Sequence, residues 1–295
     1  MKLINSIKIL LTISLFTGLF VFSNCSFAQF TTCSNTGSTT GNRIVETSDC
    51  YTQPDIQQVT FFKIALCASQ PAAPTISSST DLSSCKVVFQ NSNGSTINIQ
   101  KGATSNLVGQ FIKPPNGNYS YLYVEISPAM KAQKVAYFNG TRTNTDGSSS
   151  GTKCWSIPVD TYSYSSGSNP IATSCGADNA VTTGLGLTTI INNSLNGNSG
   201  FVNARAFPTT AGPMLNAYLV DASNKLVASA PTNSLGSVAK IVGIMQQTAN
   251  ITQQNLLSLV DIRYNNADGV AVSMGGGGVG VFSGGPFDPY LAFKY

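Results

Sequence analysis

Two serines of this chain each stand three residues before a lysine, a spacing at which the lysine amine can act as base for the serine hydroxyl. The pairs are Ser83 with Lys86 and Ser237 with Lys240. Such a lysine acts as a base only where desolvation or a neighbouring cation lowers its pKa. Enzymes of this type also carry S-D-N and K-T-G elements, which are absent from this sequence. We therefore interpret both strings as coincidences in a serine-rich chain.

Carboxylates offer a second route to hydrolysis, because a pair of Asp or Glu side chains can cleave glycosides. Glu46 and Glu125 are the only glutamates, and the aspartates are scattered along the chain. Glu125 interrupts the apolar segment 119–127, which predicts a position at the edge of a sheet with a lysine as its partner. An inward-facing carboxyl with a raised pKa is the alternative, since burial disfavours the charged form.

The sequence contains no histidine. Without imidazole, a Ser-His-Asp triad, a Cys-His pair and the zinc motif H-E-x-x-H are excluded. For calcium, the nearest string is residues 265–269, with Asp261 upstream, and it lacks the spaced carboxylates and terminal glutamate of an EF-hand loop. The formal net charge of +4 is small and dispersed, unlike the basic footprint of a nucleic-acid-binding protein. We therefore expect no catalytic residues, no cofactor, no metal ion and no nucleic-acid partner.

Aromatic side chains give the best indication of a binding surface. Three tyrosines alternate along one segment, so that their rings would share one face of a β-strand, and exposed aromatic faces suit the stacking of sugar rings. A tryptophan and two further tyrosines follow between the last two cysteines. The competing interpretation is that all of these are ordinary strand or core residues, with the tryptophan packed against a disulfide. The candidate glycan-binding residues are Tyr119, Tyr121, Tyr123, Trp155, Tyr162 and Tyr164.

Short segments rich in β-branched and aromatic residues recur along the chain, separated by glycine, asparagine, proline and serine. Dipeptides such as Asn93-Gly94, Asn139-Gly140 and Asp268-Gly269 suit the tight turns of β-hairpins. This pattern predicts an all-β fold, an antiparallel β-sandwich that is stabilised by disulfides and built as one unit or as two packed β domains. The expected strands cover 59–67, 85–90, 119–127, 134–138, 216–222, 261–265 and 269–274.

Residues 1–28 have the layout of a secretory signal peptide. Lys2 and Lys8 precede an apolar core, and Ser26-Phe27-Ala28 forms a small-x-small cleavage site. Cys25 follows the apolar core, which leaves lipidation as an alternative to this cleavage. No later segment has the roughly 20 apolar residues of a membrane-spanning helix. We expect an exported chain, extracellular or on the outer cell surface, with the periplasm as an alternative.

The cysteines indicate disulfides. Seven cysteines less Cys25 leave six, and an even number in an exported chain is typical of a disulfide framework. The absence of histidine and of any C-x-x-C string argues against zinc. Because all six lie before residue 176, we predict a cysteine-containing β domain over 29–175 and a cysteine-free β domain over 176–295. Short gaps between sequence neighbours favour the pairs Cys33–Cys50, Cys67–Cys85 and Cys154–Cys175.

The C-terminal residues 291–295 alternate between apolar and other side chains and end on an aromatic residue. This pattern resembles the last strand of outer-membrane β-barrels, and also that of chaperone–usher pilus subunits, although Lys294 replaces their penultimate aromatic residue. Two longer stretches, 59–127 and 239–265, together resemble uncharacterised secreted β-rich proteins of marine bacteria. That resemblance implies bacterial export, and it implies no activity, cofactor or site.

Charged residues make up only 9% of the chain, against about 25% in an average domain, so its contacts depend on hydrogen bonds and strand edges. We therefore predict a secreted or cell-surface structural or adhesive protein that self-assembles through strand addition. The segments expected to exchange are 29–37 and 290–295. Its partners would be other copies of itself or surface glycans. A carbohydrate-binding module, an outer-membrane β-barrel and a carboxylate or Ser-Lys hydrolase are the alternatives.

Overall fold

The computed structural model describes residues 31–144, 147–158, 173–190, 204–207, 214–227, 237–253, 259–266, 268–273, 281–284 and 288–294, so the predicted signal peptide lies outside the described residues. Within these ranges the chain forms strands and turns and no helix. The predicted all-β, antiparallel and disulfide-stabilised fold is confirmed. The strands are β1 (Thr31–Thr32), β2 (Cys50–Thr52), β3 (Ile56–Cys67), β4 (Cys85–Ile99), β5 (Gln110–Phe111), β6 (Gly117–Ile126), β7 (Met130–Gln133), β8 (Val135–Thr143), β9 (Ser150–Ser156), β10 (Thr173–Gly176), β11 (Thr188–Ile190), β12 (Ala204–Phe207), β13 (Met214–Val220), β14 (Lys240–Ile251), β15 (Leu259–Asn265), β16 (Val270–Ser273), β17 (Val281–Gly284) and β18 (Asp288–Lys294).

The largest sheet has nine strands in the order β11-β7-β3-β6-β14-β13-β12, with β4 paired to β3 and β5 paired to β4. Strand β3 is its long central element: its first residues pair with β7 and its later ones pair with β6. β6 and β7 follow one another along the chain and are separated only by Ser127-Pro128-Ala129. Because Pro128 has no N–H to donate to a ladder, the two strands act as one strand with a bend.

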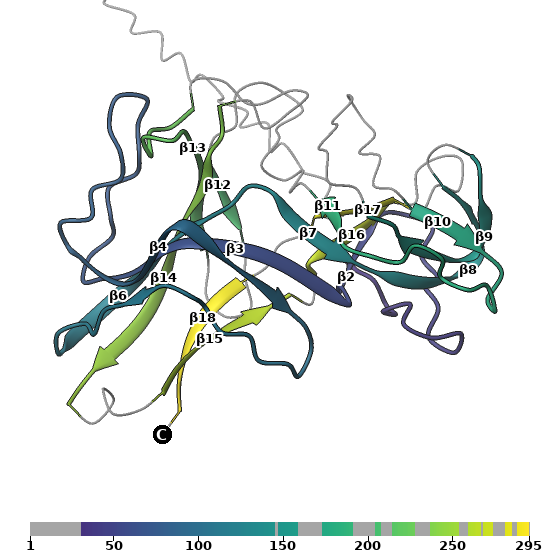
Figure 1. The fold of residues 1–295 in the computed structure, drawn as a ribbon, viewed down its shortest axis with the longest axis horizontal. Coiled ribbons are helices and arrows are strands. Elements are labelled where there is room, and N and C mark those ends of the chain that lie inside the picture. Colours follow the sequence, from purple (N-terminus) through teal and green to yellow (C-terminus); the bar gives the residue numbers. More distant parts are fainter. Residues whose placement is uncertain are drawn as a thin grey trace, which may run out of the picture.

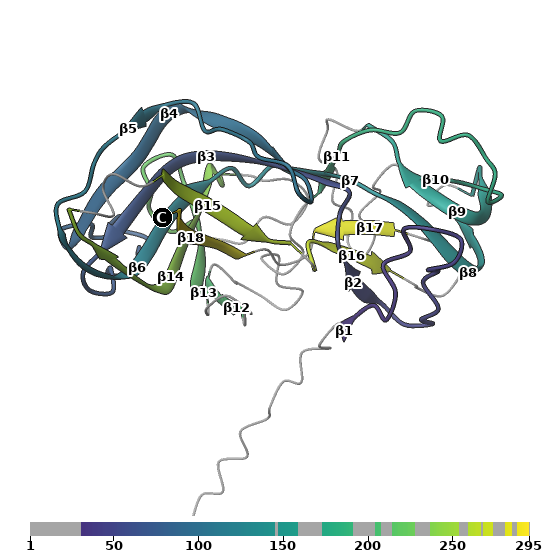
Figure 2. The same ribbon diagram turned by 90° about the horizontal axis from the view of Figure 1, so that it is seen from below.

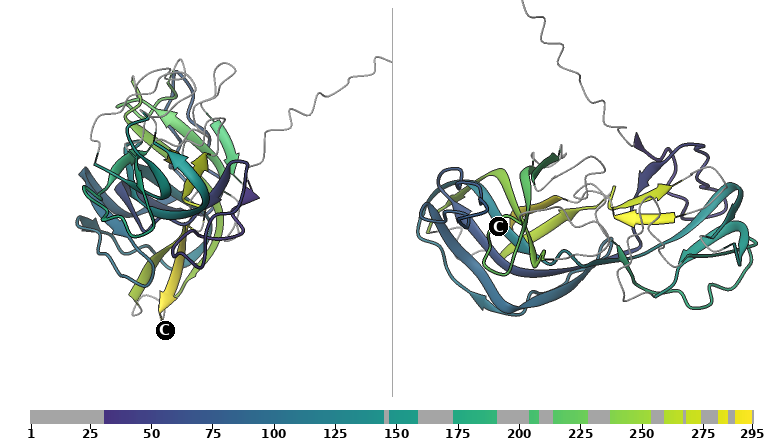
Figure 3. Two further views of the ribbon diagram at one scale, coloured as in Figure 1. Left: turned by 90° about the vertical axis from the view of Figure 1, so that its right-hand side faces the viewer. Right: turned by 90° about the horizontal axis from the view of Figure 1, so that it is seen from above.

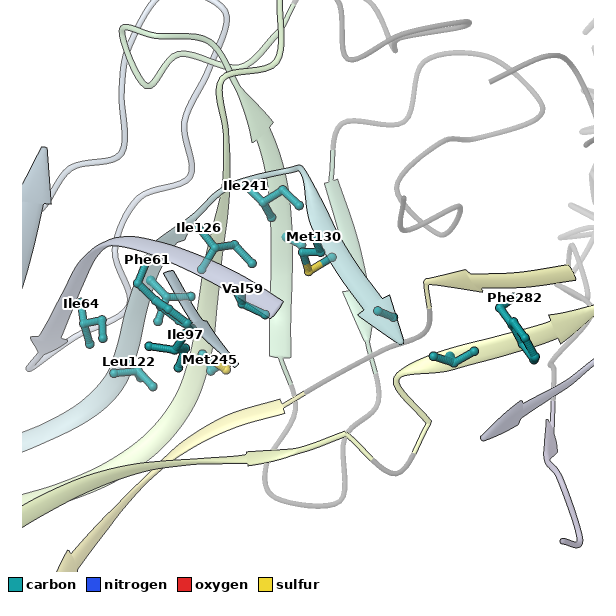
Figure 4. Close-up of a cluster of buried hydrophobic side chains, with 14 of the residues drawn as sticks. Val59, Phe61, Ile64, Ile97, Leu122, Ile126, Met130, Ile241, Met245 and Phe282 are labelled. Carbon is teal, nitrogen blue, oxygen red and sulfur yellow. The ribbon is translucent and has the colours of Figure 1, made fainter. Parts of the chain in front are cut away.

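Burial along β6 shows that the large sheet is covered on both faces. Residues 122–126 are buried without interruption, and a strand with one solvated face would alternate instead. The larger core includes Phe61, Ile97 and Leu122, which gather on one face of the sheet (Figure 4). A smaller core is formed by other side chains of the same strands and their neighbours. It consists of Ala65, Cys67, Cys85, Tyr123, Tyr218, Val220, Val242 and Ile244.

A two-stranded ribbon forms a second layer. Strands β15 and β18 pair antiparallel from Leu259 opposite Lys294 to Asn265 opposite Asp288. The ribbon lies in the hollow of the curved nine-stranded sheet (Figures 2 and 3). The arrangement is therefore sandwich-like, with a broad curved sheet on one side and a narrow ribbon on the other.

At the end of the molecule away from the β15–β18 ribbon, two further sheets form a smaller lobe (Figure 1). One has the order β10-β9-β8 and the other β1-β2-β16-β17. Ile44 forms a bridge with Phe138 of β8 and is fully buried. Because the buried side chains of this lobe belong to the same continuous core as Phe61 and Leu122, the two ends of the molecule share one hydrophobic interior.

The three predicted disulfides are confirmed. They join Cys33 to Cys50, Cys67 to Cys85 and Cys154 to Cys175. The second and third connect residues that lie directly opposite each other, in the β3–β4 and β9–β10 registers. Disulfides persist in oxidising compartments, so they indicate an exported environment. In the described part of the chain, no helix is long and apolar enough to cross a membrane.

The predicted domain boundary near residue 176 is not supported, because strands from both sides of it share sheets. β14 pairs with β6 along most of its length, and β16 pairs with β2. Among the described sheets, only the β15-β18 ribbon lies wholly on one side of this boundary, because β10 runs across it from Thr173 to Gly176. The absence of cysteines after residue 175 therefore does not mark a separate unit.

Candidate functional site

Three neighbouring strands bring together a glutamate and two lysines, Lys63, Glu125 and Lys240, which we call the charge cluster. Lys63 on β3 lies directly opposite Glu125 on β6. Lys240 begins β14, whose next residue pairs with the neighbour of Glu125 on β6. Since β6 lies between β3 and β14, the carboxylate occupies the middle of the sheet with one ammonium group on each side.

The geometry leaves neither oxygen of the Glu125 carboxylate free. Its Oε1 lies 3.1 Å from Nζ of Lys63 and accepts a hydrogen bond of 2.9 Å from the Tyr123 hydroxyl. Its Oε2 accepts a hydrogen bond of 2.8 Å from Nζ of Lys240. The Glu125 side chain is 1% exposed, whereas those of Lys63 and Lys240 are 26% and 21% exposed. The lysine stems thus cross the sheet surface and their ammonium groups reach inward to a buried anion.

A turn after β13 completes the surroundings of Lys240. Its ammonium donates a second hydrogen bond, of 3.0 Å, to Oδ1 of Asn224 and lies 5.5 Å from the centre of the Phe62 ring. Asn224 has a φ of 59°, a left-handed conformation that asparagine tolerates better than most residues. The Asp221 carboxylate accepts the backbone N–H of Lys225, and such Asx turns fix short loops. The turn therefore holds Asn224 in place over the cluster.

The charges determine the protonation of the cluster. Burial alone raises the pKa of Glu125, but the hydrogen bond from Lys240 and the charge of Lys63 outweigh it, so that the pKa lies below its usual value. The pKa of Tyr123 is raised far above its ordinary value, first by burial and then by the neighbouring Glu125. At neutral pH the cluster therefore holds an ionised carboxylate and a protonated tyrosine.

This arrangement is suited to holding strands together and not to acid–base catalysis. A general acid needs a carboxyl that stays protonated near neutral pH, and the pKa of Glu125 is shifted in the opposite direction. The predicted lysine partner of Glu125 is confirmed, and so is the inward-facing carboxyl of the alternative. The predicted position at a sheet edge and the raised pKa are both wrong. Lys63 was not recognised from the sequence, although it interrupts the apolar segment 59–67 just as Glu125 interrupts its own strand.

A second buried charge lies where the large sheet meets the smaller lobe. Lys134 connects β7 to β8, is almost fully buried, and has its Nζ 3.6 Å from Oδ1 of Asp55. Asp55 also accepts the backbone N–H of Val135 at 2.7 Å. Burial lowers the pKa of Lys134, and the charge of Asp55 opposes this only in part. Asp55 therefore fixes both the side chain and the backbone at the junction.

The alternating tyrosines do not form an exposed platform. Tyr119 is buried in the larger core and donates its hydroxyl to the carbonyl of Pro115 at 2.9 Å. Tyr123 is buried in the smaller core, and Tyr121 is partly buried against it. The prediction of one shared, exposed face is wrong because β6 is a central strand, covered on both sides, and its alternating residues are distributed between two cores.

Trp155 has the structural role that was the alternative to glycan binding. It is buried on β9, its indole Nε1 donates to the carbonyl of Thr183 at 3.0 Å, and it follows directly on the disulfide-bonded Cys154. A Cβ at Gly176 would lie 3.5 Å from the Trp155 ring, so the indole packs closely on β10 beside the disulfide. The remaining candidates, Tyr162 and Tyr164, lie outside the described residues.

The other sequence strings contribute no reactive group within the described residues. Lys240, of the second Ser-x-x-Lys string, donates to Glu125 and Asn224, and Lys86, of the first, is exposed. Cys33, Glu46 and Cys50 come close enough to hold a metal ion, but both sulfurs are bonded to each other and a metal requires thiolates.

Strand edges are the remaining candidate sites. Within the described part of the chain, β18 pairs with β15 and with no other strand, so one edge of β18 carries backbone N–H and C=O groups without a strand partner. Pro289 lies within it, and proline within a sheet is confined to edge strands and bulges. No known protein family, curated protein or solved structure matches this chain.

Proposed function

We propose that this protein is an exported cell-surface structural or adhesive protein that associates with copies of itself through the open edge of β18. The observation that carries the proposal is the β15–β18 ribbon, whose C-terminal strand has seven residues and one paired edge. An unpaired edge is a template for another strand, and strand addition is a common mode of association.

The composition of β18 supports an antiparallel, two-fold pairing between two copies. If two β18 strands pair about Leu291, Asp288 of one copy lies opposite Lys294 of the other, twice per dimer. Opposite charges across an antiparallel pair are stabilising, and a two-fold interface uses the same surface of both copies. The sequence of β18 therefore complements itself in this register.

The N-terminal segment is less suited to exchange than the sequence suggested. Thr31 and Thr32 pair with β2 in the same chain, the N–H of Cys33 donates to the carbonyl of Tyr51 at 2.7 Å, and Cys33 is tied to Cys50. A covalently anchored strand with backbone partners is not available to another molecule. This supports assignment of the contact to the C-terminal strand.

The proposal is tested by sedimentation velocity of the mature chain over a range of concentrations. We expect the wild type to dimerise and a chain truncated before residue 290 to remain monomeric. Lys294→Asp should weaken association, and Asp288→Lys combined with Lys294→Asp should restore it, because the exchanged charges are again complementary. Lys101→Asp, an equal charge change at an exposed position outside the ribbon, is the matched control.

The charge variants keep the strand intact, so they separate loss of association from loss of folding. A wild type that stays monomeric at every concentration would contradict the proposal. Association that survives the truncation, or a charge-exchanged variant no better than Lys294→Asp alone, would contradict it as well.

A further inference from the structure

The outer edge of the large sheet presents apolar side chains to solvent. Strand β5 lies at that edge beside β4 (Figure 2). In and beside it, Val108 is 73% exposed, Phe111 65% and Ile112 38%. Single exposed apolar residues are ordinary, but here three occur within five positions of one sheet edge, and we call these three residues the β5 tip.

Hydrogen bonds hold the β5 tip rigidly against β4. The N–H of Val108 donates to Oγ of Ser95 at 2.7 Å, and its carbonyl accepts from Nδ2 of Asn91 at 2.7 Å. The N–H of Ile112 donates to the carbonyl of Val88 at 3.0 Å. The apolar side chains are therefore presented by a fixed backbone, so that a partner would not have to order a loose loop.

The charged residues that flank the β5 tip in the sequence all have one sign. Lys86, Lys101 and Lys113 are exposed, and no aspartate or glutamate occurs between Asp81 and Glu125. Continuing the register that sets Phe89 opposite Phe111 brings Lys113 to within one position of Lys86 across the two strands. Apolar side chains bordered by lysines are the composition that binds the interface of an anionic bilayer.

We propose that the β5 tip is a docking surface for anionic lipid membranes, with Val108, Phe111 and Ile112 entering the headgroup region and the lysines contacting lipid phosphates. A second copy is the poorer occupant, because it would bring together two segments that each carry lysines and no acidic residue, and like charges repel. An acidic polysaccharide could form ion pairs with the lysines, but it offers no apolar phase in which the three apolar side chains could be buried.

The experiment measures binding of the mature chain to large vesicles of phosphatidylcholine alone and of an equimolar mixture with phosphatidylglycerol. We expect binding to the mixed vesicles only. Phe111→Ser should lower the partition coefficient about tenfold, as expected for the loss of one buried aromatic side chain. Lys113→Gln should lower it about fivefold. Ile76→Ser, at a position that is 67% exposed in another loop, is the matched control and should bind like the wild type.

Val108→Ser provides a second apolar variant in case Phe111→Ser disturbs the contact between the Phe111 and Phe89 rings, whose centres are 5.2 Å apart. Dextran sulfate serves as a polyanion without an apolar phase. Absence of binding to the mixed vesicles would overturn the proposal. Binding to vesicles and to dextran sulfate that is equally insensitive to Phe111→Ser and Val108→Ser would overturn it too, in favour of a purely ionic surface.

Discussion

Replacing Glu125 with glutamine tests whether the charge cluster holds the large sheet together. The substitution keeps the shape of the side chain but removes the charge that both lysines contact, at 3.1 Å for Lys63 and 2.8 Å for Lys240. One amide oxygen remains to accept from Tyr123, whereas the amide NH₂ faces an ammonium group and cannot accept from it.

The size of the effect follows from the exposure of the three side chains. Removing one partner of a buried ion pair costs about 3–5 kcal/mol. Because the two lysines are 26% and 21% exposed, their ammonium groups can turn toward water, and we expect the lower end of that range, about 3 kcal/mol. For a chain of this size the melting temperature should fall by ~6–12 °C.

Guanidinium unfolding followed by circular dichroism and by fluorescence of Trp155, the only tryptophan, measures the change. Glu46→Gln is the matched control, since Glu46 is the only other glutamate. It accepts backbone N–H groups of Ser34 and Val45 and has no lysine partner among the described residues. We expect a loss below about 1 kcal/mol for the control. Equal losses of stability in Glu125→Gln and Glu46→Gln would show that the charge cluster does not hold the large sheet together.

Three further predictions concern acid and the small lobe. The pKa of Glu125 is lower in the folded chain than in the unfolded chain, so its contribution to the free energy of unfolding is complete above about pH 4.3 and is lost as the pH falls through the folded value. The free energy of unfolding of the wild type should therefore drop more steeply in acid than that of Glu125→Gln. Parallel pH profiles of the two proteins would contradict this. A Cβ at Gly151 would lie 1.8 Å from the carbonyl oxygen of Gly176, so Gly151→Ala should separate β9 from β10 and shift Trp155 fluorescence, whereas Gly140→Ala, with no atom within 4 Å, should leave it unchanged. Replacing both cysteines of the β9–β10 disulfide with alanine should cost about 3 kcal/mol in chemical unfolding, and an unchanged midpoint would show that the loop is already restrained without the bond.

The disulfide pairing could be predicted because it is a local property of the chain. Sequence separations of 17, 18 and 21 residues show that each bond joins two cysteines that are consecutive in the sequence. Two of the bonds close antiparallel pairs in which the strands follow each other along the chain, β3 with β4 and β9 with β10. Alternating segments and turn dipeptides likewise report on local conformation, so the all-β class was accessible from the sequence.

The charge cluster and the burial of the tyrosines could not be predicted, because both depend on which strands become neighbours. Lys240 is 115 residues from Glu125, and no local pattern specifies that β14 pairs with β6. The burial of Tyr123 likewise depends on residues far away in the sequence, because Tyr218 and Val242 lie in the same core cluster. Long-range pairing also joins β2 to β16, which removes the predicted domain boundary.

The cross-strand disulfides also have a mechanical consequence. Cys67 and Cys85 form the last residue pair of β3 and β4, and Cys154 and Cys175 face each other within β9 and β10. When such a chain is pulled from its ends, separation of the paired strands stops at the disulfide. The residues between the two bonded cysteines therefore never come under tension. Together the three loops withhold on the order of 190 Å of contour length. The oxidised chain therefore extends less far under force than the reduced chain, by about this length.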